Sequence, residues 1–231
     1  MGKILMFGNQ KGGVGKTQVS IMTATALSQK PFGLKTCIVD IDNQKSVVRS
    51  RSFDMRAYKI DNPPYEVFNY TIADLQANIE QLDKNFQLII IDAAGKLDNT
   101  QPIETQEITK ALMYVDCLLI PFVAGNYNLE STIDYFRFIK LVQQQRAIQP
   151  RKLRTYGFTN QYRQRSRANS FLNEDIEILK KSENLNMMAN ALNDYASFRE
   201  SDTITSLYDT QSSDSAKQNF SIWVNELVKV I

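Results

Sequence analysis

Short runs of apolar residues alternate along this chain with segments whose apolar residues recur at helical spacing. The continuous runs predict strands that are covered on both faces, as in a parallel sheet, and the intervening segments predict crossover helices. Strands are predicted at residues 4–7, 34–42, 65–70, 86–92, 116–122, 156–160 and 185–188. This alternation predicts an α/β fold with a doubly wound, mostly parallel sheet that is flanked by helices.

Helices are predicted between these strands, and Thr71 is expected to cap one of them. Another is predicted over residues 106–114. The C-terminal stretch, residues 214–231, places large apolar side chains on one helical face, namely Phe220, Trp223, Val224, Leu227 and Ile231. Such a face either packs on the sheet or lies on a membrane surface. We favour packing on the sheet, because helices that lie on membranes are rich in basic residues and this stretch has only two, Lys217 and Lys229.

A glycine-rich segment, residues 8–17, separates the first predicted strand from the first predicted helix. Its glycines allow backbone conformations that are closed to other residues, so that consecutive N–H groups can surround a polyanion. The helix that follows adds unpaired N–H groups and the positive end of its dipole. Lys16 can reach the β- and γ-phosphates of a nucleotide, and the hydroxyl of Thr17 can bind Mg²⁺.

Acidic residues end two of the predicted strands. Asp40 and Asp42 close one of them and point the same way from an extended chain, while Asp92 closes another in a Walker B pattern. Open α/β sheets place their ligands at the carboxyl ends of strands, so these acids are expected beside the phosphates. The chain contains no histidine, and its chemistry must therefore run on carboxylates, lysines, amides and a metal ion.

Composition narrows the remaining possibilities. With 231 residues, 43% of them hydrophobic and 23% charged, the chain suits one α/β domain, and we predict a single domain over residues 1–231. Cys37 and Cys117 lie in apolar runs and are expected to be buried free thiols in a reducing compartment. Without a signal peptide or an apolar run long enough to span a bilayer, the protein is expected to be cytoplasmic.

A nucleic-acid site would have to come from local clustering of positive charge, because the net charge is only +2. Arginines and lysines concentrate around the sixth predicted strand, at Arg151, Lys152, Arg154, Arg163, Arg165, Arg167, Lys180 and Lys181. Arg163, Arg165 and Arg167 are the candidate DNA contacts, and a solvated loop face is the alternative reading.

The run Lys11-Gly12-Gly13-Val14-Gly15-Lys16-Thr17 departs from the ordinary P-loop pattern, in which Gln10 would be glycine. It resembles the ParA/MinD family of deviant Walker A P-loop ATPases, and most of all short ParA-type partition proteins without an N-terminal DNA-binding extension. The resemblance implies bound ATP and Mg²⁺. It assigns nucleotide binding to Lys11, Gly12, Gly13, Val14, Gly15, Lys16, Thr17, Gln18 and Asn160, the last of these toward the adenine ring.

The same resemblance implies roles in hydrolysis. Lys11 would reach the nucleotide held by a second subunit, Lys16 would neutralise phosphate charge, and Asp42 would orient or deprotonate the attacking water. Thr17, Asp40 and Asp92 would hold Mg²⁺ or its water shell. Asn43 stands where the family has proline, which loosens the turn after Asp42. The segment Ala93-Ala94-Gly95 occupies the place of a mobile switch, with Gly95 as its hinge.

The function implied is a slow, Mg-dependent ATPase that forms a homodimer on ATP binding and coats DNA without sequence preference. It would associate with the nucleoid in this state. A ParB-like activator would stimulate hydrolysis and couple it to movement of a plasmid, chromosome or mobile element. The alternatives are a MinD-like positioning ATPase on a membrane, a metabolic enzyme on the same scaffold, and a nucleotide-binding adaptor that has lost hydrolysis.

Overall fold

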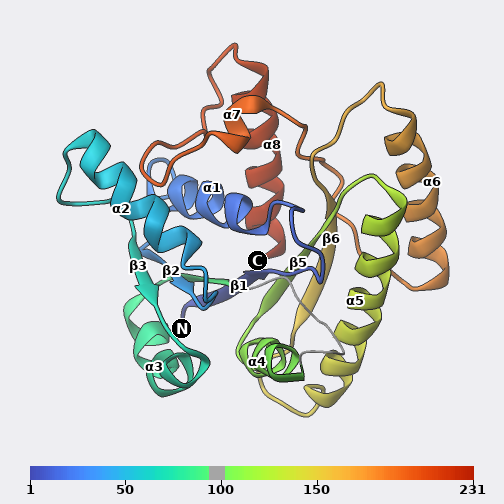
Figure 1. The fold of residues 1–231 in the computed structure, drawn as a ribbon, viewed down its shortest axis with the longest axis horizontal. Coiled ribbons are helices and arrows are strands. Elements are labelled where there is room, and N and C mark those ends of the chain that lie inside the picture. Colours follow the sequence, from blue (N-terminus) through green and yellow to red (C-terminus); the bar gives the residue numbers. More distant parts are fainter. Residues whose placement is uncertain (94–101) are drawn as a thin grey trace.

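A computed structural model describes residues 1–93 and 102–231 and contains a six-stranded sheet with parallel neighbours throughout (Figure 1). The strands lie side by side in the order β3-β2-β4-β1-β5-β6. Their bounds are β1 Lys3–Phe7, β2 Thr36–Asp40, β3 Glu66–Asn69, β4 Leu88–Asp92, β5 Cys117–Phe122 and β6 Arg154–Thr159. The predicted doubly wound parallel sheet is confirmed.

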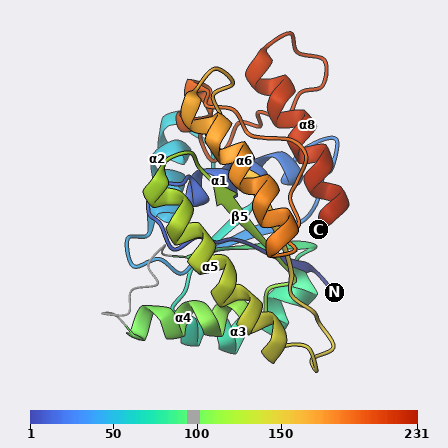
Figure 2. The same cartoon turned by 90° about the vertical axis from the view of Figure 1, so that its right-hand side faces the viewer.

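Helices cover both faces of this sheet (Figures 1 and 2). The helices α1, α2, α7 and α8 contribute to the apolar core on one face, and α3, α4, α5 and α6 to the core on the other. Their bounds are α1 Lys16–Ser28, α2 Ser46–Tyr58, α3 Ile72–Asn85, α4 Pro102–Leu112, α5 Asn126–Gln145, α6 Arg167–Ser182, α7 Ala196–Arg199 and α8 Ser215–Val230. The result is a three-layer arrangement.

Successive residues of β1 show why the apolar runs are continuous. Leu5 and Phe7 belong to the core beneath α1 and α8, whereas Ile4 and Met6 belong to the core beneath α3, α4 and α5. Side chains of a strand alternate between the two faces of a sheet, and here helices cover both faces, so that consecutive residues are buried.

The C-terminal helix packs on the sheet, as favoured. Trp223 of α8 is fully buried, and its ring centroid lies 6.3 Å from that of Phe7 and 5.3 Å from that of Phe158. The helix therefore supports β1, the strand that leads into the glycine-rich segment. In the described part of the chain, no helix is long and apolar enough to cross a membrane.

Two helix starts test the sequence predictions. Thr71 caps α3 as predicted, in a reciprocal capping box with Asp74. By contrast, α4 begins at Pro102, before the predicted start at residue 106. Proline is favoured in the first turn of a helix, where its missing N–H group would have had no intrahelical partner.

The strand predicted at residues 185–188 is wrong. This segment makes only an isolated bridge, between Met187 and Gly157 of β6. The pairing is then interrupted, because the backbone N–H groups of Ala189 and Asn190 donate to the carboxylate of Glu226, at 2.5 and 2.8 Å. It resumes at Leu192, whose N–H group donates to the carbonyl of Thr159, at 2.9 Å. A side chain of α8 thus satisfies groups that a sheet ladder would have used.

The basic concentration inferred from the sequence is divided by β6. Arg151 precedes this strand, and its guanidinium pairs with Asp116 and with Asp83, the latter at 3.3 Å. The side chain also donates to the carbonyl of Gly2, at 2.8 Å. Arg151 therefore joins elements at the amino end of the sheet, whereas Arg163 follows its carboxyl end. The two arginines do not belong to one patch.

A buried polar cluster joins α2 to the segment that follows α7. Arg51 donates to the hydroxyl of Thr203, at 3.0 Å, and to the carbonyl of Tyr65, at 2.6 Å. Asp54 accepts hydrogen bonds from the N–H group and the hydroxyl of Thr203, at 2.8 and 2.7 Å. Both charged residues are buried and hydrogen-bonded, as a buried charge requires. We call this set the Thr203 cluster.

Candidate functional site

The glycine-rich segment crosses from β1 to α1 at the carboxyl end of the sheet, as predicted. Gly13 and Gly15 have φ values of 77° and 87°, in the left-handed region that favours glycine. A Cβ atom at Gly15 would lie 2.6 Å from the side-chain nitrogen of Asn160. Glycine is thus required at position 15 both by the backbone and by its neighbour.

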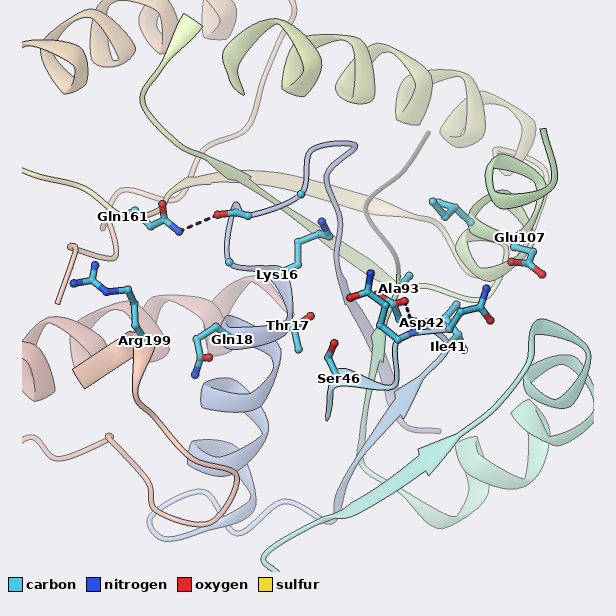
Figure 3. A pocket seen from close by; sticks show the side chains of 16 residues that line it. Lys16, Thr17, Gln18, Ile41, Asp42, Ser46, Ala93, Glu107, Gln161 and Arg199 are labelled. Carbon is cyan, nitrogen blue, oxygen red and sulfur yellow. Dashed lines mark hydrogen bonds between the residues drawn. The ribbon is translucent and has the colours of Figure 1, made fainter. Parts of the chain in front are cut away.

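Contacts with β5, with α5 and with the residues just after β6 hold this loop in place. Asn9 is buried, and its Nδ2 atom donates to the carbonyl of Pro121, at 2.9 Å, and to the hydroxyl of Thr132, at 2.7 Å. Asn160 donates to the carbonyl of Val14, at 2.8 Å. Gln161 donates to the carbonyl of Gly13, at 3.2 Å (Figure 3). Asn9 and Gln161 were not predicted, because their partners are distant in sequence.

The two lysines of the loop have different surroundings. The side chain of Lys16 is largely buried and donates to the carbonyl of Lys11, at 3.0 Å. Burial lowers the pKa of Lys16, and the nearby carboxylates of Asp92 and Asp42 oppose this effect. Lys11 itself is exposed. Lys16 therefore lies in the interior of the site, and Lys11 lies on its outer surface.

Asp92 lies at the end of β4, below the first turn of α1. Its carboxylate accepts hydrogen bonds from the hydroxyls of Thr17, at 2.9 Å, and Ser20, at 3.3 Å. Burial raises the pKa of Asp92 to about 7, and the hydrogen bond from Thr17 opposes this rise. Ser20 was not predicted. Its spacing from Thr17, nearly one helical turn, is the signal that could have identified it.

Asp40 ends the neighbouring strand and pairs in register with Asp92. One carboxylate oxygen accepts the N–H group of Asp42, at 3.1 Å, and the other accepts those of Val47 and Val48, at 3.0 and 3.4 Å. Burial raises the pKa of Asp40, while these backbone hydrogen bonds lower it. Asp40 thus fixes the start of α2. Its predicted contact with a metal-bound water stays a prediction.

The turn after Asp42 is held without the family's proline. The Asp42 carboxylate accepts the N–H group of Gln44, at 2.9 Å, and the Asp42 carbonyl accepts that of Lys45 at the same distance. The first bond forms an Asx turn, in which an aspartate side chain fixes its own loop. Asn43 is exposed in this turn. Two local hydrogen bonds therefore replace the constraint that a proline ring would supply.

These parts surround a cavity of about 620 Å³ (Figure 3). Its walls come from the glycine-rich loop, the Asp42 turn, Ala93, Glu107 of α4, Gln161 and Arg199. This volume is in the range of small-molecule sites. A second cavity of about 60 Å³ lies against Asn160, Leu192 and Phe198. Ala94 and Gly95 of the predicted switch lie outside the described residues.

The predicted DNA contacts lie beyond the end of β6. Arg163, Arg165 and Arg167 are all exposed, the last at the start of α6. Arg163 pairs with Asp194, at 2.5 Å, and the guanidinium of Arg167 lies 5.4 Å from the ring centroid of Phe171. The structure thus brings the three arginines to one loop and places two of them against neighbouring side chains.

A glycine-rich loop between a strand and a helix, with an aspartate ending the adjacent strand, defines a P-loop nucleotide-binding protein. The sequence profile described as "CobQ/CobB/MinD/ParA nucleotide binding domain" matches residues 5–202. The chain belongs to this family of P-loop NTPases, which confirms the ParA/MinD resemblance. A comparison with curated protein sequences finds no match.

Solved structures of several named functions share this fold. A plasmid partition protein from Borrelia burgdorferi has a TM-score of 0.66 and 19% identity, covering 100% of this chain and 99% of its own. Cobyrinic acid a,c-diamide synthase from Mycobacterium smegmatis, with bound ADP and magnesium, has a TM-score of 0.66 and 16% identity, covering 99% of this chain and 95% of its own. The MinD cell division protein from Aquifex aeolicus has a TM-score of 0.67 and 12% identity, covering 98% of this chain and 97% of its own. Similarity at these identities shows the fold alone.

Proposed function

We propose that this protein is an ATPase that dimerises on ATP, binds DNA without sequence preference and positions a plasmid, chromosome or mobile element with a ParB-like partner. The different placement of the two loop lysines carries the proposal. Lys16 is one of the described residues that line the 620 Å³ cavity, whereas the exposed Lys11 is not. A lysine on the outer side of its own phosphate loop can reach a nucleotide bound by a second copy, as an arginine finger does.

Within one subunit, the loop amides and Lys16 bind the phosphates, and Asp42 orients or deprotonates the attacking water. The water oxygen attacks the γ-phosphorus as the bond to the β-phosphate oxygen breaks, which releases ADP and inorganic phosphate. Turnover stays slow until the ParB-like partner lowers the barrier. A γ-phosphate can then act as a timed switch between the dimer and separate subunits.

The residues at the end of β4 suit a magnesium ion. Thr17 and Asp92 present a hydroxyl and a carboxylate that lie 2.9 Å apart, and oxygen ligands of this kind are the ones that Mg²⁺ prefers. We assign Thr17 to the ion, and Asp92 and Asp40 to its water shell. When bound, Mg²⁺ neutralises charge on the β- and γ-phosphate oxygens.

The small cavity beside Asn160 is suited to the adenine ring. It adjoins the phosphate loop at Gly15 and is walled by apolar residues, among them Met22 and Leu192. Asn160 lies at its edge, where its amide already supports the loop through Val14. In this arrangement Asn160 has two tasks, because it braces the phosphate loop and borders the base.

Replacing Lys11 with alanine should abolish the ATP-dependent dimer and leave ADP binding to the monomer within about threefold of wild type, since its side chain serves the second subunit. Size-exclusion chromatography with light scattering, in Mg²⁺ and a non-hydrolysable ATP analogue, measures the dimer. Lys30→Ala removes an exposed lysine elsewhere and should dimerise normally. A Lys11→Ala protein that dimerises like wild type would contradict the contact between subunits.

DNA binding should require ATP and weaken steeply with salt, because phosphate contacts release counterions. The double variant Arg165→Ala/Arg167→Ala should lower the slope of log affinity against log salt by about 2, one unit for each lost contact. Fluorescence anisotropy on two unrelated duplexes measures this slope. The control Lys152→Ala/Lys229→Ala removes two exposed lysines and should leave it unchanged. Equal slopes for the two double variants would reject the arginine loop as the DNA surface.

A further inference from the structure

Arg199, the last residue of α7, lies where the two cavities of the site adjoin. Gly15, Gln18, Gln161 and Arg199 each line both cavities. Figure 3 shows the Arg199 side chain on the side of Lys16 that is away from Asp42, with Gln18 and Gln161 nearby. Among the described residues that line the larger cavity, the cationic side chains are those of Lys16 and Arg199.

A carboxylate holds Arg199 in this place. One oxygen of Asp194 pairs with Nη1 of Arg199, and the other pairs with Nη2 of Arg163, at 2.5 Å. The Asp194 side chain is only 8% exposed, whereas those of Arg199 and Arg163 are 60% and 70% exposed. The Asp194 N–H group also donates to the carbonyl of Tyr162, at 2.9 Å. The guanidinium of Arg199 thus extends from a fixed, mostly buried support.

Two positive groups share this single carboxylate, so the set Arg163–Asp194–Arg199 keeps a net positive charge beside the nucleotide cavity. A guanidinium carries five N–H donors in a planar fork, and its pairing through Nη1 leaves further donors that can point at an anion. Arginine suits phosphate recognition because this fork matches two phosphate oxygens at once.

We call the place where the two cavities adjoin the joint. In a nucleotide that fills both cavities, the nucleoside would connect to its phosphates at this joint. The larger cavity is lined by the phosphate loop, and the smaller one offers the apolar side chains of Val19, Met22, Leu192 and Phe198 beside polar ones. A ligand that fills both must pass its α-phosphate and ribose between Gln18 and Arg199. The N-terminus of α1 faces the same place and favours negative charge there.

We propose that Arg199 binds the phosphate chain of a nucleoside diphosphate or triphosphate at this joint, and that Asp194 positions it. The assignment rests on the proposed nucleotide site and adds a contact from the opposite wall. It also links that site to Arg163, since both arginines depend on the same carboxylate. In a purely structural role, by contrast, the Asp194 pair would only join α7 to the loop after β6.

The test is the affinity of the full chain for ADP with Mg²⁺, measured by isothermal titration calorimetry without DNA. Arg199→Ala and Arg199→Gln should each weaken ADP binding about tenfold, because a charge-assisted hydrogen bond to phosphate is lost. Their unfolding temperatures without nucleotide should stay close to that of wild type, since Arg199 is largely exposed. Arg49→Ala, which removes an exposed charge from α2, should bind ADP as wild type does.

Unchanged ADP affinity in both Arg199 variants would overturn the assignment and leave the proposed nucleotide site intact, provided that wild type binds ADP. Wild-type protein that fails to bind ADP would instead reject the nucleotide site itself. If Arg49→Ala weakened ADP binding as much as Arg199→Ala, the effect would belong to general surface charge, and the specific contact would be wrong. The glutamine variant carries the test if the alanine variant does not fold.

Discussion

Replacing Asp92 with asparagine should abolish most Mg-dependent ATP hydrolysis and, at the same time, stabilise the ligand-free protein. The loss of activity is expected to be roughly 100-fold, the upper range for groups that orient the shell of a metal ion. The gain in stability has a different origin. Asp92 is buried, and its carboxylate is costly to ionise there, whereas asparagine is neutral and can still accept the hydrogen bond from Thr17.

The stabilisation should depend on pH in a defined direction. The pKa of Asp92 is about 7 in the folded protein and about 4 in an unfolded chain. Between these values the unfolded state has released a proton that the folded state still holds, so the stability of wild type falls as pH rises through this window. At pH 8 the variant should therefore exceed wild type by about 4 kcal/mol, because each unit of pKa difference corresponds to about 1.4 kcal/mol, and near pH 4 this advantage should vanish.

Thermal unfolding in EDTA, from pH 4 to 8, measures the difference between the two proteins. Asp61→Asn, which neutralises an exposed carboxylate, serves as the control and should show no such pH-dependent gain. An Asp92→Asn protein that is less stable than wild type at pH 8 would show that the carboxylate is favourable in the ligand-free site. Asp92 would then not lower the stability of the protein in return for its part in hydrolysis.

Replacing Trp223 with alanine should destabilise the fold by about 3–5 kcal/mol, as truncation of a large buried aromatic side chain does. In a chain of this length, the loss should lower the midpoint of thermal unfolding by roughly 10 °C. Trp223 is fully buried against Phe7 and Phe158, so the cavity would open directly under β1. We also expect weaker nucleotide binding near the unfolding temperature, because β1 leads into the phosphate loop.

The adjacent residue provides a matched control. Ile222 is 53% exposed on the same helix, and Ile222→Ala should change the free energy of unfolding by no more than about 0.5 kcal/mol. Similar unfolding temperatures for the two variants, together with wild-type protein that sediments with liposomes, would mean that α8 acts at a membrane and that its packing on the sheet is incidental.

Local patterns predicted the parts of the site that are close in sequence. The spacing of glycines and lysines between Gly8 and Thr17 reports directly on a strand, a loop and a helix, because each depends on its immediate neighbours. Asp40 and Asp92 were placed correctly at strand ends for the same reason, whereas the pairing of their two strands was seen only in the structure. The length of the apolar runs was sufficient to predict a sheet covered on both faces.

Predictions failed where a distant side chain decides the local structure. Residues 185–188 are apolar enough for a strand, but Glu226 of α8 binds the backbone that follows and interrupts the pairing with β6. The sequence around Asn9 did not indicate that this residue holds the phosphate loop, since its partners Pro121 and Thr132 come from β5 and α5. Arg163 was predicted as a DNA contact, with a solvated loop face as the alternative, and that prediction stays untested. Its pairing with Asp194 was not predicted, because Asp194 comes much later in the chain.

The Thr203 cluster also bears on how the protein is made. Thr203 lies 152 positions after Arg51, so a ribosome that adds about 5–20 residues per second exposes it roughly 8 to 30 seconds later. Until then, Arg51 has its hydrogen bond to the carbonyl of Tyr65 but not the one to Thr203, and Asp54 lacks both of its hydrogen bonds from Thr203, so the docking of α2 is incomplete. The turn that carries Asp42 precedes α2 directly and should be among the last parts to become rigid. Translation that stalls before residue 203 would thus leave a nascent chain with a phosphate loop but without a firmly held Asp42 turn.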